Sequence, residues 1–104
     1  MAEDAYLAVT TPLGRQVRTT AAYWDVIATL KHPIMRGKEV LVQQALQTPI
    51  EIRQSKSDPS VYLHYGVEPP YLICVVVRYL NGDGFIITAY RTNKIKEGAV
   101  VWTP

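Results

Sequence analysis

Cysteine, long apolar runs and tracts of one charge are all scarce in this 104-residue chain. The one cysteine, Cys74, lies in the apolar run YLICVVVRYL, so an internal disulfide framework is excluded and a small buried thiol is expected. No stretch approaches the roughly 18 uninterrupted apolar residues of a membrane span, and the start MAEDAYLAV carries acids where a secretory signal carries positive charge. We therefore expect a soluble, cytoplasmic protein without membrane contact.

The sequence also lacks recognisable motifs for binding a metal or a nucleotide. The two histidines, His32 and His64, lie on separate predicted elements, and the ligand spacing of a zinc or two-metal site is not visible. A glycine-rich phosphate loop followed by Lys-Ser or Lys-Thr is also missing from the sequence. We therefore expect no metal and no cofactor.

The composition is that of an ordinary globular protein, with 48% hydrophobic and 19% charged residues and a net charge of +2. The length predicts a single domain spanning residues 1–104. Basic residues fall at the edges of predicted elements rather than in one tail. This pattern fits either a phosphate-sized patch or solvated surface charge, and the sequence leaves both open.

Helical spacing in the first half of the chain predicts two short helices. The segment AAYWDVIATL follows a plausible N-cap at Thr20, and GKEVLVQQALQ, over residues 37–47, is stopped by Pro49. The residues expected on the buried faces are Tyr23, Trp24, Ile27 and Leu30 in the first helix and Val40, Leu41, Ala45 and Leu46 in the second. A short hairpin, AYLAVT and RQVRTT around TPLG, is expected ahead of them.

Four segments rich in β-branched and aromatic residues follow, namely IEIRQS, VYLHY, YLICVVVRYL and GFIITAYRT. The turn sequence NGDG, residues 81–84, tolerates positive φ and predicts a hairpin between the last two segments. We therefore predict an α+β fold in which two N-terminal helices pack on an antiparallel sheet of about four strands. One face of that sheet should be covered by the helices and the other partly open.

Strand alternation predicts which side chains lie on the open face. Those assigned to it are Arg53, Ser55, Tyr62, His64, Thr88, Tyr90 and Thr92, whereas Phe85, Ile87 and Ala89 are assigned to the helix side. A merely solvated face more often carries Lys and Glu, and this set instead offers hydrogen-bond donors that suit phosphate oxygens and bases.

The stretch KHPIMRGKEV, residues 31–40, raises the question of why a helix should end at Lys31-His32. Pro33 disfavours helical backbone before it, so His32 is predicted to be the last helical residue. It could cap the helix, or it could transfer protons near neutral pH.

These residue types fit metal-free RNA cleavage. That reaction uses the substrate's own 2′-hydroxyl as nucleophile, so the protein supplies only a base, an acid and cationic or hydroxyl donors.

The ordered motifs KHP, G-K-E, S-K-S-D-P, TAY-T and IK-G run from about Tyr23 to Trp102. This pattern resembles the phage-type branch of the barnase, EndoU, colicin and RelE-like (BECR) nuclease superfamily. The resemblance implies a helices-then-sheet fold and a metal-independent endoribonuclease that forms a 2′,3′-cyclic phosphate. Such proteins are often toxins, so RNA and an antitoxin or immunity protein are the expected partners.

The candidate catalytic residues from this resemblance are His32, Arg53, Ser55, Thr88 and Tyr90, and the candidate RNA-binding residues, some of them added from the basic and polar pattern, are Lys31, Tyr62, Thr92, Lys94 and Lys96. The chain departs from the family pattern beside Trp24, because Tyr23 stands where relatives often have His or Arg and Val26 where they often have another His. A non-catalytic module that binds RNA or a protein on the same face is therefore the alternative.

Overall fold

The computed structural model describes residues 5–95 and 98–104, so the predicted RNA contact Lys96 lies outside the described residues. The strands are β1 (Leu7–Thr10), β2 (Gln16–Thr19), β3 (Glu51–Gln54), β4 (Val61–Glu68), β5 (Tyr71–Leu80), β6 (Asp83–Thr92) and β7 (Ala99–Trp102). The helical segments are α1 (Ala21–Val26), the π-helical turn η1 (Ile27–Lys31), the 3₁₀ turn η2 (Pro33–Met35) and α2 (Glu39–Gln47).

Within the described residues the strands form one seven-stranded mixed sheet in the order β1-β2-β6-β5-β4-β3-β7. The α+β class is correct, but the predicted four-stranded antiparallel sheet under two N-terminal helices is wrong. The hairpin β1–β2 forms as expected and then joins the sheet, because β2 pairs in parallel with β6. Strand β7, which the sequence did not predict, pairs with β3 at the opposite edge.

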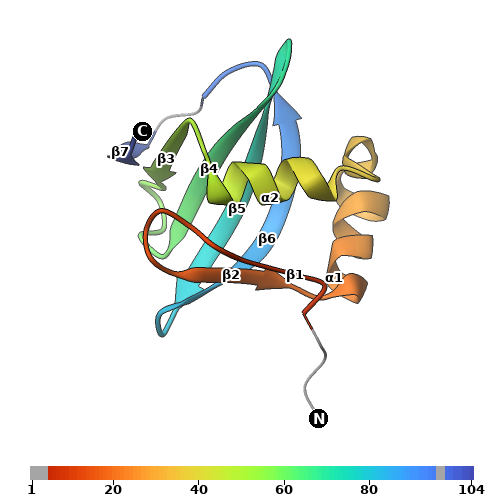
Figure 1. Cartoon of the computed structure of the whole chain (residues 1–104), viewed down its shortest axis with the longest axis horizontal. Helices are drawn as coiled ribbons and strands as arrows, with labels where there is room; N and C mark the ends of the chain where they lie inside the picture. The colour runs from red at the N-terminus through yellow and green to blue at the C-terminus, as the bar shows by residue number, and fades with distance from the viewer. Residues whose placement is uncertain (1–4, 96–97) are drawn as a thin grey trace.

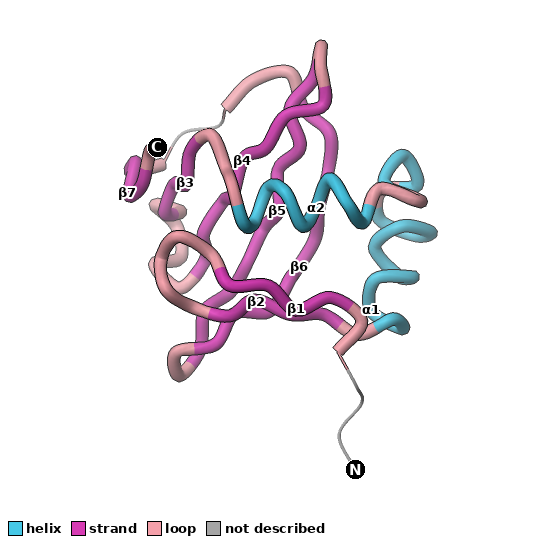
Figure 2. The backbone as a smooth tube through the Cα atoms, viewed as in Figure 1, coloured by secondary structure: helices cyan, strands magenta, loops and turns pink. Residues whose placement is uncertain are grey.

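The two helices occupy different places relative to the sheet (Figures 1 and 2). Helix α2 crosses one face and contacts β1, β4 and β5, whereas α1 lies beyond β6 at the side of the sheet. Gly66 in β4 permits the close approach of α2, since a Cβ atom at this position would lie 2.7 Å from the Cβ of Ala45. Only α2 therefore acts as the covering helix that the sequence predicted for both.

The predicted buried face of the first helix is only half correct. Trp24 and Ile27 are buried, but Tyr23 is exposed and Leu30 is 76% exposed. For Leu30 the reason is the π-helical turn, in which the His32 N–H donates to the Ile27 carbonyl at 2.8 Å, five residues back. This wider turn rotates Leu30 away from the core.

The predicted buried face of the second helix also changes in part. The residues that α2 buries are Val42, Ala45 and Leu46, with Leu41 partly buried and Val40 exposed. Val42 contributes to the core in place of Val40 because it shares one helix face with Ala45 and Leu46, at i, i+3 and i+4 spacing. The helix begins at Glu39, two residues later than predicted.

A β-bulge in β6 decides which of its side chains face α2. Val76 pairs with Thr88 while Val77 pairs with Ile86, so Ile87 is an extra residue. Thr88 lies on the face away from α2, as predicted, and Tyr90 and Thr92 alternate with it on that face. Phe85, expected under the helices, also lies on this face because Arg78 is its direct partner and shares the side of Val76.

The alternation predicted for β4 is wrong. Tyr65 pairs with Cys74, which places Tyr62 and His64 on the side of α2 rather than on the open face. Tyr62 packs edge-on against Tyr79 with ring centroids 5.1 Å apart, and His64 is completely buried. The Tyr79 hydroxyl lies 3.0 Å from His64 Nε2, which gives this ring nitrogen a hydrogen bond, whereas Nδ1 is buried without a partner among the described residues.

Acid should destabilise the fold through His64. Burial lowers the pKa of this imidazole from 6.5 to about 4, so between these values the unfolded chain binds more protons than the folded protein. The free energy of unfolding should therefore fall as the pH drops through this window, by about 2 kcal/mol between about pH 7.5 and about pH 5. Urea unfolding of the protein and of His64→Leu measures this difference. An equal loss in both proteins would assign it to other groups.

Candidate active site

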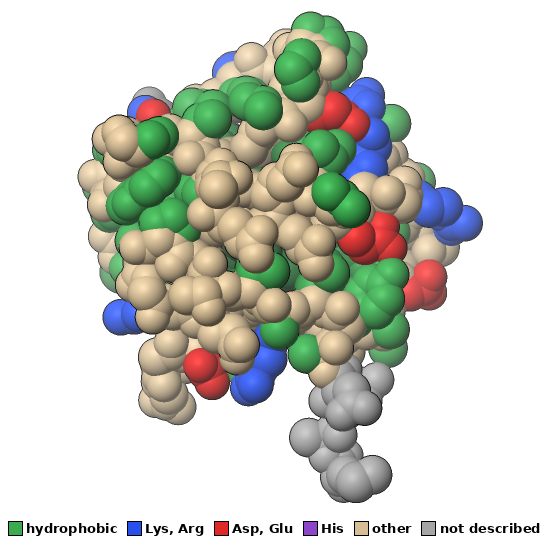
Figure 3. All heavy atoms as spheres, in the orientation of Figure 1, with side chains coloured by type: hydrophobic (Ala, Val, Ile, Leu, Met, Phe, Trp, Pro, Cys, Tyr) green, Lys and Arg blue, Asp and Glu red, His purple; other side chains and the backbone are tan. Residues whose placement is uncertain are grey.

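The face that carries α2 is largely charge-compensated. Its basic groups lie mostly beside acidic ones around the margin (Figure 3), and both Lys38 and Arg91 pair with Glu68. The opposite face of the sheet is called here the outer face. Its central cross-strand rows are Arg53–Leu63–Val76–Thr88 and Glu51–Tyr65–Cys74–Tyr90.

His32 is held by its backbone and leaves its ring available. Its N–H donates to Ile27, and its carbonyl accepts from Met35 N at 2.9 Å. The helical segment ends at Lys31, one residue earlier than predicted, and His32 takes a non-helical conformation before Pro33. Among residues 5–95 and 98–104, the imidazole makes no hydrogen bond or ion pair, so it does not cap the helix with its side chain.

The His32 ring lies against Tyr90. Their ring centroids are 5.6 Å apart and the planes are tilted by 41°. Tyr90 is half-buried on the outer face, and burial, with smaller contributions from Cys74 and Tyr65, raises the pKa of its hydroxyl. The hydroxyl therefore stays protonated at neutral pH and can act as a hydrogen-bond donor, not as a base.

Thr88 lies two residues before Tyr90 on the same face, roughly 7 Å away along the strand. Its hydroxyl oxygen is buried and has no hydrogen-bond partner in the described part of the chain. A buried polar atom without a partner costs about 1–3 kcal/mol, so its retention calls for an explanation. A ligand oxygen that accepts from this hydroxyl would provide one.

Arg53 lies on the outer face but apart from Thr88. Three strand spacings separate the two backbones, roughly 14 Å. The Arg53 guanidinium pairs with Glu51 and also donates to the Gly98 carbonyl at 3.4 Å. It can therefore meet a neighbouring phosphate, but not the group that touches Thr88.

Ser55 is placed in the turn after β3. Its hydroxyl lies 3.1 Å from that of Ser57 and accepts from Asp58 N at 3.4 Å. These contacts shape the loop, and the structure does not bring Ser55 next to His32 or Tyr90.

The predicted RNA-binding residues are scattered. Lys31 Nζ donates to the Ile87 carbonyl and the Tyr23 hydroxyl, both at 3.0 Å. The Thr92 hydroxyl donates to the Lys94 carbonyl at 3.1 Å in the turn after β6, where the Lys94 side chain is exposed. Tyr62 lies on the opposite side of the sheet, as described above.

Sequence reasoning missed Glu51 and Tyr65 as neighbours of the site. Both lie in the Tyr90 row, and Tyr65 is completely buried on the outer face. The signal that could have found Tyr65 is the short turn at residues 69–70, which fixes the β4–β5 register and so the partner of Cys74.

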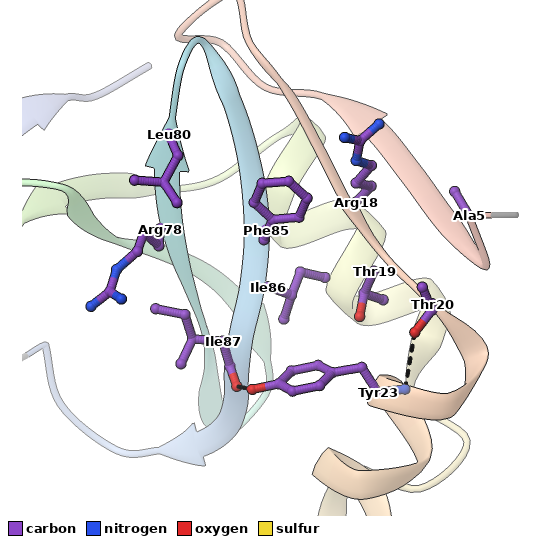
Figure 4. A pocket seen from close by; sticks show the side chains of 10 residues that line it. All are labelled: Ala5, Arg18, Thr19, Thr20, Tyr23, Arg78, Leu80, Phe85, Ile86 and Ile87. Atoms are coloured by element: carbon purple, nitrogen blue, oxygen red, sulfur yellow. Dashed lines mark hydrogen bonds between the residues drawn. The ribbon is translucent and has the colours of Figure 1, made fainter. Parts of the chain in front are cut away.

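A cavity of about 560 Å³ adjoins the outer face beside Ile87 (Figure 4). Residues that line it include Arg18, Tyr23, Arg78, Leu80, Phe85 and Ile87. The Tyr23 hydroxyl in its lining donates to the Ile87 carbonyl at 2.8 Å and accepts from Lys31, the residue before His32. The cavity and the His32–Tyr90 pair are thus neighbouring features of one region.

The described residues contain no group of three or more His, Cys, Asp or Glu side chains that could hold a metal ion. Nor does that part of the chain contain a helix of the length and apolarity needed to cross a membrane. Comparison with protein-family models, curated proteins and solved structures yields no match to this chain.

Proposed function

We propose that this protein is a metal-independent endoribonuclease, related to the phage-type BECR nucleases, with His32, Tyr90 and Thr88 as its catalytic centre. The observation that carries the proposal is the contact of the His32 ring with the Tyr90 ring, whose centroids lie 5.6 Å apart. The His32 imidazole makes no hydrogen bond in the described chain. The two residues lie far apart in the sequence, and both belong to the motifs on which the resemblance rests.

The proposed reaction needs only groups of this chain and the RNA. His32 takes the proton from a ribose 2′-hydroxyl, whose oxygen then forms a bond to the adjacent phosphorus. The bond from phosphorus to the 5′-oxygen breaks, and that oxygen receives a proton from the neutral Tyr90 hydroxyl or from water. Thr88 donates to a non-bridging oxygen, where negative charge develops.

Arg53 and the lysines have a different role in this proposal. They bind phosphates on either side of the cleaved one, since Arg53 is too far from Thr88 to share its phosphate. A toxin-like use of this activity, with an antitoxin or immunity protein covering the outer face, is part of the proposal and follows from the family resemblance.

Cleavage should proceed unchanged in excess EDTA and leave 2′,3′-cyclic phosphate and 5′-hydroxyl ends. The reason is that the 2′-hydroxyl supplies the nucleophile and protein groups supply the proton transfers. Purified protein incubated with total RNA and with tRNA, followed by end-group analysis, tests this. Activity that disappears with EDTA and returns with Mg²⁺ would contradict the mechanism.

The non-catalytic alternative rests on Tyr23 and Val26, at positions where the family often has His or Arg. In the structure the Tyr23 hydroxyl donates a hydrogen bond to the Ile87 carbonyl. Tyr23 therefore links the helix to β6 and does not take the place of a proton carrier. Protection of the same RNA, without any cleavage, would favour this alternative.

A further inference from the structure

Three outer-face residues form a cation–aromatic–cation row next to the proposed catalytic centre. Phe85 pairs with Arg18 of β2 on one side and with Arg78 of β5 on the other. The Arg18 guanidinium lies 5.0 Å from the centre of the Phe85 ring. Figure 4 shows the three side chains around the cavity, with Phe85 between the two arginines.

Phe85 presents an exposed aromatic ring on the outer face. It is the one phenylalanine of the chain and it is 40% exposed, with its ring lining the 560 Å³ cavity. Leu80 and Ile87 add apolar walls. An exposed aromatic ring in a concave apolar site is what a flat ring ligand needs for stacking.

The two arginines beside this ring are held by exposed ion pairs. Arg18 is paired with Asp83 at 3.6 Å and Arg78 with Asp58 at 3.0 Å, and all four side chains are more than 40% exposed. Exposed pairs of this kind contribute little, so a phosphate can compete for either guanidinium. Arginines on both sides of an aromatic ring suit a base flanked by phosphates.

We propose that Phe85, Arg18 and Arg78 form a subsite that stacks one unpaired base of single-stranded RNA and binds its flanking phosphates. The inference rests on the proposed function for its ligand class. The base stacks on Phe85 inside the cavity, and the strand continues along β6 toward Thr88. Phe85 and Thr88 lie on one face opposite Arg78 and Val76, which are two residues apart, roughly 7 Å, so the subsite takes a nucleotide near the cleaved bond.

The choice of single-stranded RNA follows from the stacking itself. A base within a duplex is already stacked on its neighbours and cannot present its face to a side chain. The bulge at Ile87 is the feature that makes the subsite possible, because without it Phe85 would face α2.

Equilibrium binding of a fluorescein-labelled eight-nucleotide single-stranded RNA tests the subsite. The full chain carrying His32→Ala is used, so that binding is measured without cleavage. Adding Phe85→Leu should raise the Kd at least about fivefold, the lower end of the loss expected for one stacked base. The matched control is Tyr71→Leu, because Tyr71 is also 40% exposed under an arginine, Arg91, but faces the α2 side. It should leave the Kd unchanged.

Two further measurements separate the parts of the proposal. Arg18→Gln and Arg78→Gln should each reduce the slope of log Kd against log salt by about 0.7, whereas Arg15→Gln on the α2 side should not. A duplex of the same sequence should bind at least roughly tenfold more weakly than the single strand, given the loss of base stacking. Equal effects of Phe85→Leu and Tyr71→Leu, or equal binding of both RNA forms, would overturn the subsite.

Cleavage by the unmutated protein, measured in parallel, distinguishes this proposal from the proposed function. Binding that depends on Phe85 without cleavage of any RNA supports the subsite and refutes the nuclease. Cleavage that is accompanied by Phe85-independent binding supports the nuclease and refutes the subsite.

Discussion

Replacing His32 with alanine is expected to lower RNA cleavage by roughly 10²- to 10⁴-fold and to leave the free energy of unfolding nearly unchanged. The imidazole is the proposed base, and the described residues give it no hydrogen bond whose loss would weaken the fold. Initial rates on a defined single-stranded RNA, together with urea unfolding, measure both quantities on the same preparation.

Leu30→Ala is the matched control for this experiment. Leu30 lies two residues before His32, in the helical segment that ends at Lys31, and is 76% exposed, so its truncation should change neither the rate nor the stability. The competing role of His32 is structural capping. A stability loss of about 1 kcal/mol with unchanged turnover would establish that role and refute the catalytic one.

Thr88→Val is expected to lower cleavage by roughly 10²-fold, the effect of losing one donor to the developing charge, while making the protein more stable. The substitution keeps the shape of the side chain and removes a buried hydroxyl that has no partner in the described structure. Removing such a group should raise the free energy of unfolding by up to about 1 kcal/mol. Opposite changes in activity and stability are the signature of a group kept for a ligand.

The control for Thr88 lies on the same strand and face. The Thr92 hydroxyl donates to the Lys94 carbonyl, so Thr92→Val should lose stability rather than gain it. If Thr88→Val also loses stability and cleaves RNA at the normal rate, the hydroxyl has a structural partner and Thr88 leaves the proposed centre.

Features that depend on residues close together in the chain could be predicted from the sequence. The turn at Asn81 and Gly82 forms with both residues at positive φ, and strand β5 has the predicted bounds, residues 71–80. Cys74 is buried, as its apolar surroundings indicated. Turn chemistry and hydrophobic periodicity act over a few residues, and for that reason the α+β class could be predicted.

The candidate site was predictable only in part, and for a different reason. His32, Thr88 and Tyr90 were chosen from motifs, and the fold brings them to one region of the outer face. Tyr62 and His64 were expected on the open face because their side chains are polar. The register of β4 against β5 places both on the side of α2 instead. His64 Nε2 has a hydrogen-bond partner in the Tyr79 hydroxyl within the core. The residues near His64 in the sequence do not predict that partner.

Features that depend on distant segments could not be predicted and became apparent only in the folded chain. The parallel pairing of β2 with β6 and the addition of β7 to β3 turned the expected four-stranded sheet into a mixed one within the described residues. The bulge at Ile87 moved Phe85 to the outer face, and the π-helical turn moved Leu30 outward. Each depends on how one strand or helix meets another across the core, since a shift of one residue exchanges the two faces of a strand.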